Sequence, residues 1–266
     1  MNDSSRRTPD RALMRRRGLR VLLMAAALLA VAAGAWLAYD RWLAPGADPS
    51  ADVYPLRGVD VSAHNGDLDF EAMKADGVDF AYIKATEGTD FMDRNYVANA
   101  AGARRAGMPA GAYHFFRFDT DGEMQALNFL WALRGRDFAL PPAIDVEEWG
   151  NPDGHATALI VERLRRMTAT LEAHGYRPVI YTNKDGYYRF VRGNFDSYPL
   201  WICSFTDPPL DRRGRFDLWQ YTHRGHVEGV PRAVDLNAAR DGTFGLAARR
   251  TAGEAINRLP ATLLKR

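Results

Sequence analysis

The sequence is nearly devoid of cysteine. Its 266 residues include one, Cys203, so no intramolecular disulfide can form. Cys203 lies in the apolar run 200–203, where a small buried side chain is a simpler interpretation than a nucleophile. The length, with 47% hydrophobic residues, fits one large α/β domain or two smaller ones.

A strong charge of one sign is also absent. The net charge is +2, but the first twenty residues hold seven Arg and two Asp. Because the whole chain has 35 basic and 33 acidic residues, the remainder holds 28 and 31, a net charge of −3. The remainder therefore lacks the basic surface of nucleic-acid-binding proteins, and we expect no nucleic-acid partner.

One long uncharged apolar run stands out, residues 21–39, preceded by clustered arginines. Its length suits a membrane-spanning helix, and the arginines predict that residues 1–20 are cytoplasmic. We predict a single-pass signal-anchor at the cell membrane, with the rest of the chain extracytoplasmic. The alternative is a signal peptide cleaved after 33–35 or 45–47, which would release a secreted protein. Residues 40–54, with two Pro and several Asp, are predicted to be a linker.

From residue 55 to 242 short apolar strands alternate with helical stretches. The predicted strands are 57–61, 80–85, 109–116, 142–146, 178–181, 200–203, 216–221 and 233–236. The predicted helices are 69–76, 95–106, 121–133 and 156–174. Eight strands in this order predict an α/β fold, an irregular (β/α)8-type (TIM-like) barrel with short later crossovers. Residues 243–266 are expected to be a terminal helix or a loose tail.

Polar residues gather at the predicted strand ends. Functional side chains of such barrels lie at the carboxyl ends of the strands. The residues at or just after those ends are Asp60, Glu87, His114, Asp145, Glu147, Tyr181, Trp219 and Asp235. Acids lined by aromatic rings are typical of a carbohydrate site, because paired carboxylates cleave glycosidic bonds and rings stack on sugars.

The stretch 143–147, Ala-Ile-Asp-Val-Glu, is the most informative part of the chain. In a strand Asp145 and Glu147 point to the same side, with Cα atoms roughly 6.6 Å apart. Like charges at that range raise one pKa, which a general acid at neutral pH requires. The alternative is a strand end whose acids cap the next helix.

Several motifs resemble glycoside hydrolase family 25, the Chalaropsis-type lysozymes. They are Gly58-Val59-Asp60-Val61-Ser62 with Gly66, Ile83-Lys84-Ala85-Thr86-Glu87-Gly88-Thr89, Gly111-Ala112-Tyr113-His114-Phe115, Gln125-Ala126, the Asp145-x-Glu147 stretch, Leu218-Trp219-Gln220-Tyr221 and Val234-Asp235-Leu236-Asn237. The resemblance covers residues 56–237. The chain departs from the family at Asn65, where Gln is usual, and at Ala63, near which His is frequent, so substrate preference or rate could differ.

The resemblance implies a muramidase that hydrolyses the β-1,4 bond between N-acetylmuramic acid and N-acetylglucosamine in the glycan strands of peptidoglycan. Glu147 then matches the proton donor, Asp145 the second acid of its motif, and Asp60 and Asp235 the other cleft acids. The expected substrate-binding residues are Glu87, Tyr113, His114, Tyr181, Trp201, Trp219 and Gln220. No metal or other cofactor is required. The pair His223 and His226 lacks a third ligand and is read as a loop.

Two questions stay open. Asp145 either orients the acetamido group of the substrate as nucleophile, which we favour, or a carboxylate activates water directly. For several predicted binding residues a structural role competes: Lys84 and Glu87 as an ion pair, His114 as a wall residue, Trp201 as core. A non-catalytic peptidoglycan-binding module tethered to the membrane is the alternative function, and a lytic factor delivered elsewhere is the alternative role.

Overall fold

The computed structural model describes residues 22–35, 47–206, 209–210 and 215–247. The chain divides into two units, Met1–Pro45 and Gly46–Arg266. In the first unit residues 22–35 are helical. The predicted span 21–39 thus extends past the described residues at both ends, and the basic segment 1–20 and the tail beyond 247 lie outside them. Within the described part of the chain, no helix combines the length and apolar character needed to cross a membrane.

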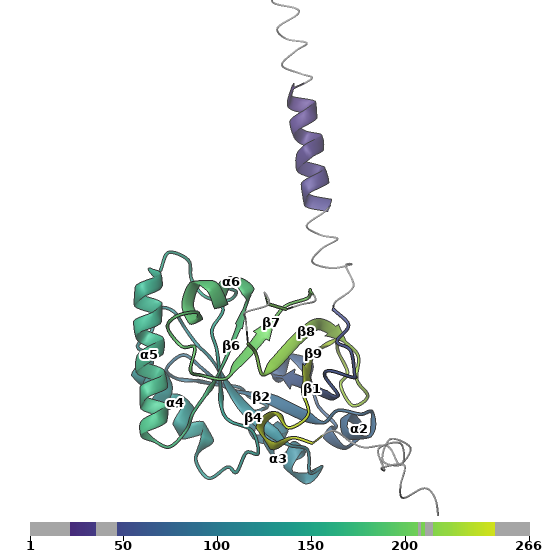
Figure 1. Ribbon diagram of the computed structural model, residues 1–266, viewed down its shortest axis with the longest axis vertical. Coiled ribbons are helices and arrows are strands. Elements are labelled where there is room, and N and C mark those ends of the chain that lie inside the picture. Colours follow the sequence, from purple (N-terminus) through teal and green to yellow (C-terminus); the bar gives the residue numbers. More distant parts are fainter. Residues whose placement is uncertain (1–21, 36–46, 207–208, 211–214, 248–266) are drawn as a thin grey trace, which may run out of the picture. The chain divides into compact units, whose positions relative to one another are not determined.

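The second unit is built on one closed sheet (Figure 1). Its strands are β1 (Leu56–Val61), β2 (Phe80–Glu87), β3 (Phe91–Met92), β4 (Ala110–Phe115), β5 (Ala143–Asp145), β6 (Val179–Asn183), β7 (Leu200–Cys203), β8 (Leu218–Gly225) and β9 (Val234–Ala239). They follow the order β1-β9-β8-β7-β6-β5-β4-β2-β3, and pairing of β1 with β2 closes the barrel. The short β3 lies outside the ring as an addition to β2. The predicted barrel of eight strands is therefore confirmed.

The last strand departs from a regular (β/α)8 barrel. β9 is antiparallel to both neighbours, β1 and β8. Eight residues separate β8 from β9, whereas a parallel crossover needs a dozen or more, so the chain returns as a hairpin. The expectation that Asp235 lies at a carboxyl strand end is wrong. It lies near the start of β9, and strand reversal brings it to the rim where the other strands end, in register with Asp60.

Helices cover the first half of the barrel more completely than the second. They are α2 (Phe70–Ala75), α3 (Tyr96–Arg105), α4 (Gly122–Leu133), α5 (Thr157–Ala173) and α6 (Lys184–Gly186), with the π-helical turn η2 (Tyr187–Val191) and the 3-10 turns η1 (Ala63–Asn65) and η3 (Thr243–Gly245). Figure 1 shows α4 and α5 together on one flank. The apolar face of α5 is buried, as its helical spacing predicts. No helix joins β7 to β8 in the described part of that connection.

Side chains alternate between the two faces of the barrel wall. The inner cluster consists of Leu56, Phe80, Tyr82, Leu140, Ala143, Val179, Tyr181, Trp201, Leu218, Ala239 and Leu246. Gly58 and Gly111 make room for its rings, because a Cβ at these positions would lie 2.2 Å from Phe80 and 2.6 Å from Tyr82. These two glycines of the sequence motifs are thus required by close packing inside the barrel.

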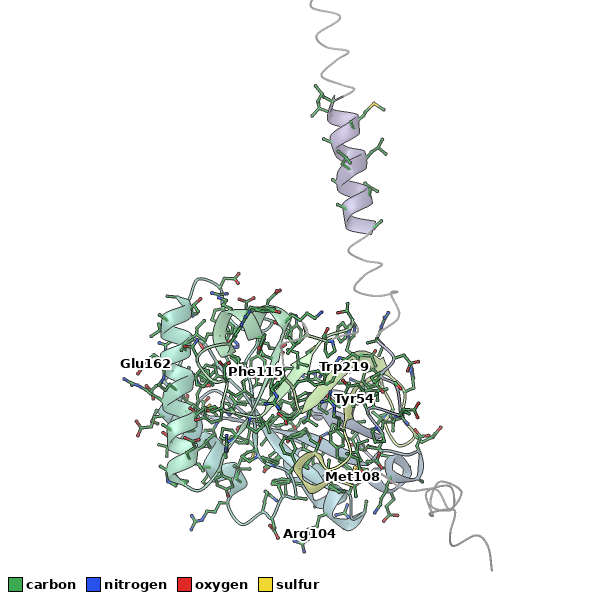
Figure 2. All side chains as sticks on the ribbon, viewed as in Figure 1. Tyr54, Arg104, Met108, Phe115, Glu162 and Trp219 are labelled. Carbon is green, nitrogen blue, oxygen red and sulfur yellow. The ribbon has the colours of Figure 1, made fainter. Side chains whose placement is uncertain are left out.

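The packed domain extends past both ends of the predicted range 55–242. Tyr54, expected in the linker, packs at ring-centroid distances of 6.0 Å from Phe216 and 5.6 Å from Trp219. Figure 2 shows Tyr54 beside Trp219. At the other end Leu246 belongs to the inner cluster. Residues on both sides of the predicted range therefore contribute to the core.

Candidate active site

Four carboxyl groups come together at one rim of the barrel interior. Asp60 projects from β1, Asp145 from β5, and Asp235 from the paired position on β9. Glu147 follows β5 by two residues, and its charge contributes to the raised pKa of Asp145, so the two carboxyl groups face the same cavity. The charges of neighbouring acids contribute to the pKa shifts of Asp145, Glu147 and Asp235, as expected of groups that share one cavity.

Asp60 is the most firmly held of the four acids. Its Oδ2 accepts hydrogen bonds from Gln220 Nε2 at 2.9 Å and Asn237 Nδ2 at 2.7 Å. Each amide is itself held, because Tyr181 OH donates to Gln220 Oε1 at 2.9 Å and Trp201 Nε1 donates to Asn237 Oδ1 at 2.7 Å. The buried aromatic layer therefore fixes the orientation of both amides and, through them, of the Asp60 carboxyl group.

Asp60 and Asp235 form the first acidic pair. Burial, the charge of Asp60 and a hydrogen bond to Asp60 raise the pKa of Asp235 to about 9. Burial raises the pKa of Asp60 as well, but the hydrogen bonds from Asn237, Gln220 and Asp235 oppose that shift. At neutral pH we therefore assign a proton to Asp235, whose carboxyl group donates a hydrogen bond to that of Asp60.

Asp145 and Glu147 form the second acidic pair. Burial, the charge of Asp60 and the opposing charge of Lys84 set the pKa of Glu147 at about 7. Burial and the charge of Glu147 raise the pKa of Asp145 well above its ordinary range. Asp145 Oδ1 is buried and has no hydrogen-bond partner within the described residues. The pair thus combines a carboxyl group that is half-protonated near neutral pH with a buried acceptor that is unpaired.

Cations adjoin the acids on the side of β2. Lys84 Nζ lies 2.9 Å from Glu87 Oε2 and 5.0 Å from the centroid of the Phe115 ring. Arg117 Nη1 lies 3.5 Å from Glu87 Oε1. The predicted binding residue Glu87 is thus a bridge between two cations, and Lys84 lowers the pKa of both Asp145 and Glu147. The ion-pair interpretation of Lys84 and Glu87 accounts for this geometry.

Tyr113, expected to bind substrate, lies among the acids. Burial raises the pKa of its hydroxyl well above the usual range, and the charges of Asp60, Asp145 and Asp235 add to the shift. Its ring packs against the inner cluster. Tyr113 therefore presents a neutral hydroxyl to the acidic cavity at any ordinary pH.

Two predicted substrate-binding residues face away from the cleft. His114 is fully buried between β4 and α4, where it bonds to Thr86 Oγ1 at 2.8 Å and Gln125 Oε1 at 3.1 Å. Trp219 is fully buried in the outer core and donates to Ser204 O. The sequence placed both at carboxyl strand ends, which holds for His114 in β4 but is wrong for Trp219, the second residue of β8. Both side chains also point outward, because adjacent residues of a strand point in opposite directions.

Three other predicted binding residues lie beneath the acids. Trp201 is 2% exposed, and its ring centroid lies 4.7 Å from that of Tyr82. Tyr181 and Gln220 are also buried and engaged in the hydrogen bonds that lead to Asp60. These three residues therefore support the Asp60 carboxyl group from below. The rings of Trp201 and Tyr181 cannot stack on a sugar, because core side chains cover them.

Several residues of the site were not predicted from the sequence. Asn237 was noted only as part of a motif, yet it bonds directly to Asp60. Arg117 and Asn151 join the loops around Glu147, and neither belongs to a recognisable pattern. Cys203 points into the barrel, where burial raises the pKa of its thiol. It is therefore not a thiolate nucleophile at neutral pH.

An eight-stranded barrel with paired carboxyl groups at one rim defines a class, the glycoside hydrolases that work by acid chemistry. The family profile "Glycosyl hydrolases family 25" matches residues 59–230. Since this range is more than half of the chain, the protein belongs to glycosyl hydrolase family 25.

Individual proteins agree with this assignment. Lysozyme M1 of Streptomyces globisporus is 31% identical over 205 residues, covering 70% of this chain and 68% of that protein. The uncharacterized protein YegX of Escherichia coli K12 is 30% identical over 190 residues, or 69% of each. The structure of a family 25 glycosyl hydrolase from Bacillus anthracis matches with a TM-score of 0.68 and 31% identity, covering 81% of this chain and 97% of that one.

Proposed function

We propose that the protein is a lysozyme-type muramidase that cleaves the β-1,4 bond between N-acetylmuramic acid and N-acetylglucosamine in peptidoglycan. The observation that carries the proposal is Glu147, a carboxyl group at the barrel rim where burial and the charge of Asp60 raise its pKa to about 7, so that it retains a proton near neutral pH. A general acid needs this, because it must hold a proton yet release it to the leaving oxygen. The names of relatives such as Lysozyme M1 support the substrate.

Asp145 is assigned the stabilisation of the sugar cation that bond cleavage leaves. Its unpaired Oδ1 is free to accept the N–H of the 2-acetamido group. This bond would hold the acetamido oxygen against the anomeric carbon, so that the substrate supplies its own nucleophile and configuration is retained. Asp60, fixed by two amides, faces the same cavity, and its hydrogen bonds from Asn237 and Gln220 favour the negatively charged form.

The test is digestion of purified peptidoglycan by residues 47–266, beside the Glu147→Gln variant. Reduced fragments are identified by mass. We expect disaccharides with a reducing N-acetylmuramic acid end, and a loss of at least about 10²-fold in the variant. Anhydro ends would instead indicate a lytic transglycosylase. Glycan that is bound but never cut would reject hydrolysis and favour a wall-binding module.

We also propose that the amino-terminal segment tethers the enzyme to the cell membrane. The support is the uncharged run 21–39 behind an arginine cluster, within which residues 22–35 are helical. The catalytic barrel would then act outside the cytoplasm, on wall close to the membrane. Fractionation of cells expressing the full chain should recover it with membranes after a high-salt wash, whereas a shortened product in the medium would support signal cleavage.

A further inference from the structure

The strand ladder ends before it reaches the proposed proton donor. β5 ends at Asp145, whose carbonyl accepts from Phe116 N at 2.9 Å. The next carbonyl, Val146 O, accepts from Thr182 Oγ1 at 2.7 Å. Glu147 therefore lies on a segment where side chains replace the strand as hydrogen-bond donors, and the position of its carboxyl group depends on those side chains.

Asn151 is the donor that holds Glu147 itself. Its Nδ2 donates to Glu147 O at 2.9 Å and to Phe116 O at 3.0 Å, while its Oδ1 accepts from Phe118 N at 2.8 Å. One amide group thereby joins the loop after β5 to the loop after β4. All three bonds go to backbone atoms, so they constrain the main chain on both sides.

The turn that carries Asn151 is itself well defined. Asn151 N donates to Glu148 O at 3.0 Å, which closes a four-residue turn. Gly150, its third residue, has a φ of +82°, a conformation that favours glycine. Arg117 Nη1 donates to Gly150 O at 2.7 Å. The Asn151 side chain therefore projects from a turn that two hydrogen bonds and the Gly150 conformation hold in place.

We propose that Asn151 is a positioning residue that holds the Glu147 backbone, and with it the proton donor, against the acidic rim of the barrel. This inference rests on the proposed role of Glu147 as general acid. Without the Asn151 side chain, the segment after β5 loses two of its hydrogen bonds to the β4–α4 loop and the bond to the Glu147 carbonyl, and the Glu147 carboxyl group moves toward solvent. A displacement of about 1 Å from reacting geometry reduces turnover by about 10²-fold.

Two variants and a matched control test the role. Asn151→Ala removes all three bonds. Asn151→Asp keeps the shape and the acceptor for Phe118 N but removes both N–H donors, so it remains informative if the alanine variant folds poorly. Asn128→Ala is the control, because Asn128 Nδ2 also donates to two backbone carbonyls, Gly88 O at 3.0 Å and Phe91 O at 3.2 Å, without touching the Glu147 segment.

The first readout is independent of enzymatic activity. The pKa of Glu147 is measured in each variant by NMR of the labelled carboxyl carbon. Burial is the largest cause of the raised pKa of Glu147. Release of the carboxyl group toward solvent in Asn151→Ala should therefore lower this pKa by at least about half a unit. In Asn151→Asp the added negative charge should keep the pKa of Glu147 raised. In Asn128→Ala the pKa of Glu147 should not change.

The second readout is peptidoglycan turnover. Both Asn151 variants should lose kcat by about 10–100-fold with little change in KM, while Asn128→Ala stays within about threefold of the parent. An unchanged Glu147 pKa and kcat in Asn151→Ala, or equal losses in Asn128→Ala, would overturn the positioning role. If the parent chain does not cut peptidoglycan, the proposed function fails, and the NMR titration alone still decides whether Asn151 positions Glu147.

Discussion

At the scale of residues, the site is governed by the cost of crowding four carboxyl groups into one buried rim. Burial raises the pKa of each, and their mutual charges add to the shift for Asp145, Glu147 and Asp235. The amides of Asn237 and Gln220 lower the pKa of Asp60, and Lys84 lowers the pKa of Asp145 and Glu147. The balance leaves protons on the rim at a pH where exposed carboxyl groups would have lost them, and acid catalysis needs those protons.

The alkaline limb of the activity profile should reflect Glu147. As pH rises through about 7 the group loses its proton, so kcat/KM should fall, approaching tenfold per pH unit. Lys84→Met removes the cation that lowers this pKa, and the limb should then move upward by about one pH unit. Initial rates on soluble glycan fragments between pH 4 and 9 measure both. A limb that moves downward in Lys84→Met would contradict the assigned sign.

Stability should decrease with pH because of Asp235. Its pKa is raised from 3.8 to about 9 on folding, so between these values the folded chain binds more protons than the unfolded chain and loses stability as pH rises. Asp235→Asn keeps a donor for Asp60 but cannot ionise. We expect its Tm to exceed that of the parent at pH 8 and to differ little at pH 4, with activity reduced. Equal Tm differences at both pH values would argue against a titrating Asp235.

At the scale of elements, the two faces of each strand have different roles. Inward residues of β1, β5 and β9 carry the acids, and outward residues bind the helices. His114 illustrates the second face: burial lowers its pKa to about 4, so it is neutral above that pH. Its neutral ring links Thr86 of β2 to Gln125 of α4, which in turn holds Arg117 N at 2.7 Å.

Trp219 should behave as a core residue of β8. Trp219→Ala should lower the free energy of unfolding by about 3–5 kcal/mol, because it removes a fully buried ring. Trp219→Phe should cost less and, below its Tm, leave KM for glycan and the pH profile unchanged. Denaturant titration and kinetics at low temperature distinguish these outcomes from substrate stacking, which would raise KM in both variants.

At the scale of the whole molecule, the second unit depends on segments that flank the strands. Tyr54 packs against Trp219 on the outer side, and Leu246 belongs to the inner cluster. Both lie outside the range that the strand pattern alone marks as the domain.

A fragment of residues 47–247 should therefore be more stable than one of residues 55–242. Losing two partly or fully buried side chains costs a few kcal/mol, and each kcal/mol lowers the Tm by about 2–4 °C in a domain of this size. Calorimetry of both fragments measures the difference. Equal Tm values would show that the flanking segments pack without stabilising the barrel.

The sequence by itself determined the element order, the barrel class and the four acids. Strand and helix periods are local properties of the chain, and the sequence predicts a common side for Asp145 and Glu147 because they are two positions apart. Tertiary structure decided what depends on distant residues. It reversed β9, so that Asp235 meets Asp60 from the opposite strand direction. It turned His114 and Trp219 outward, and it recruited Asn237 and Asn151, whose partners lie far along the chain or in an irregular loop. Hydrogen bonds of that kind follow no sequence period, because only the closed barrel brings their donors and acceptors together.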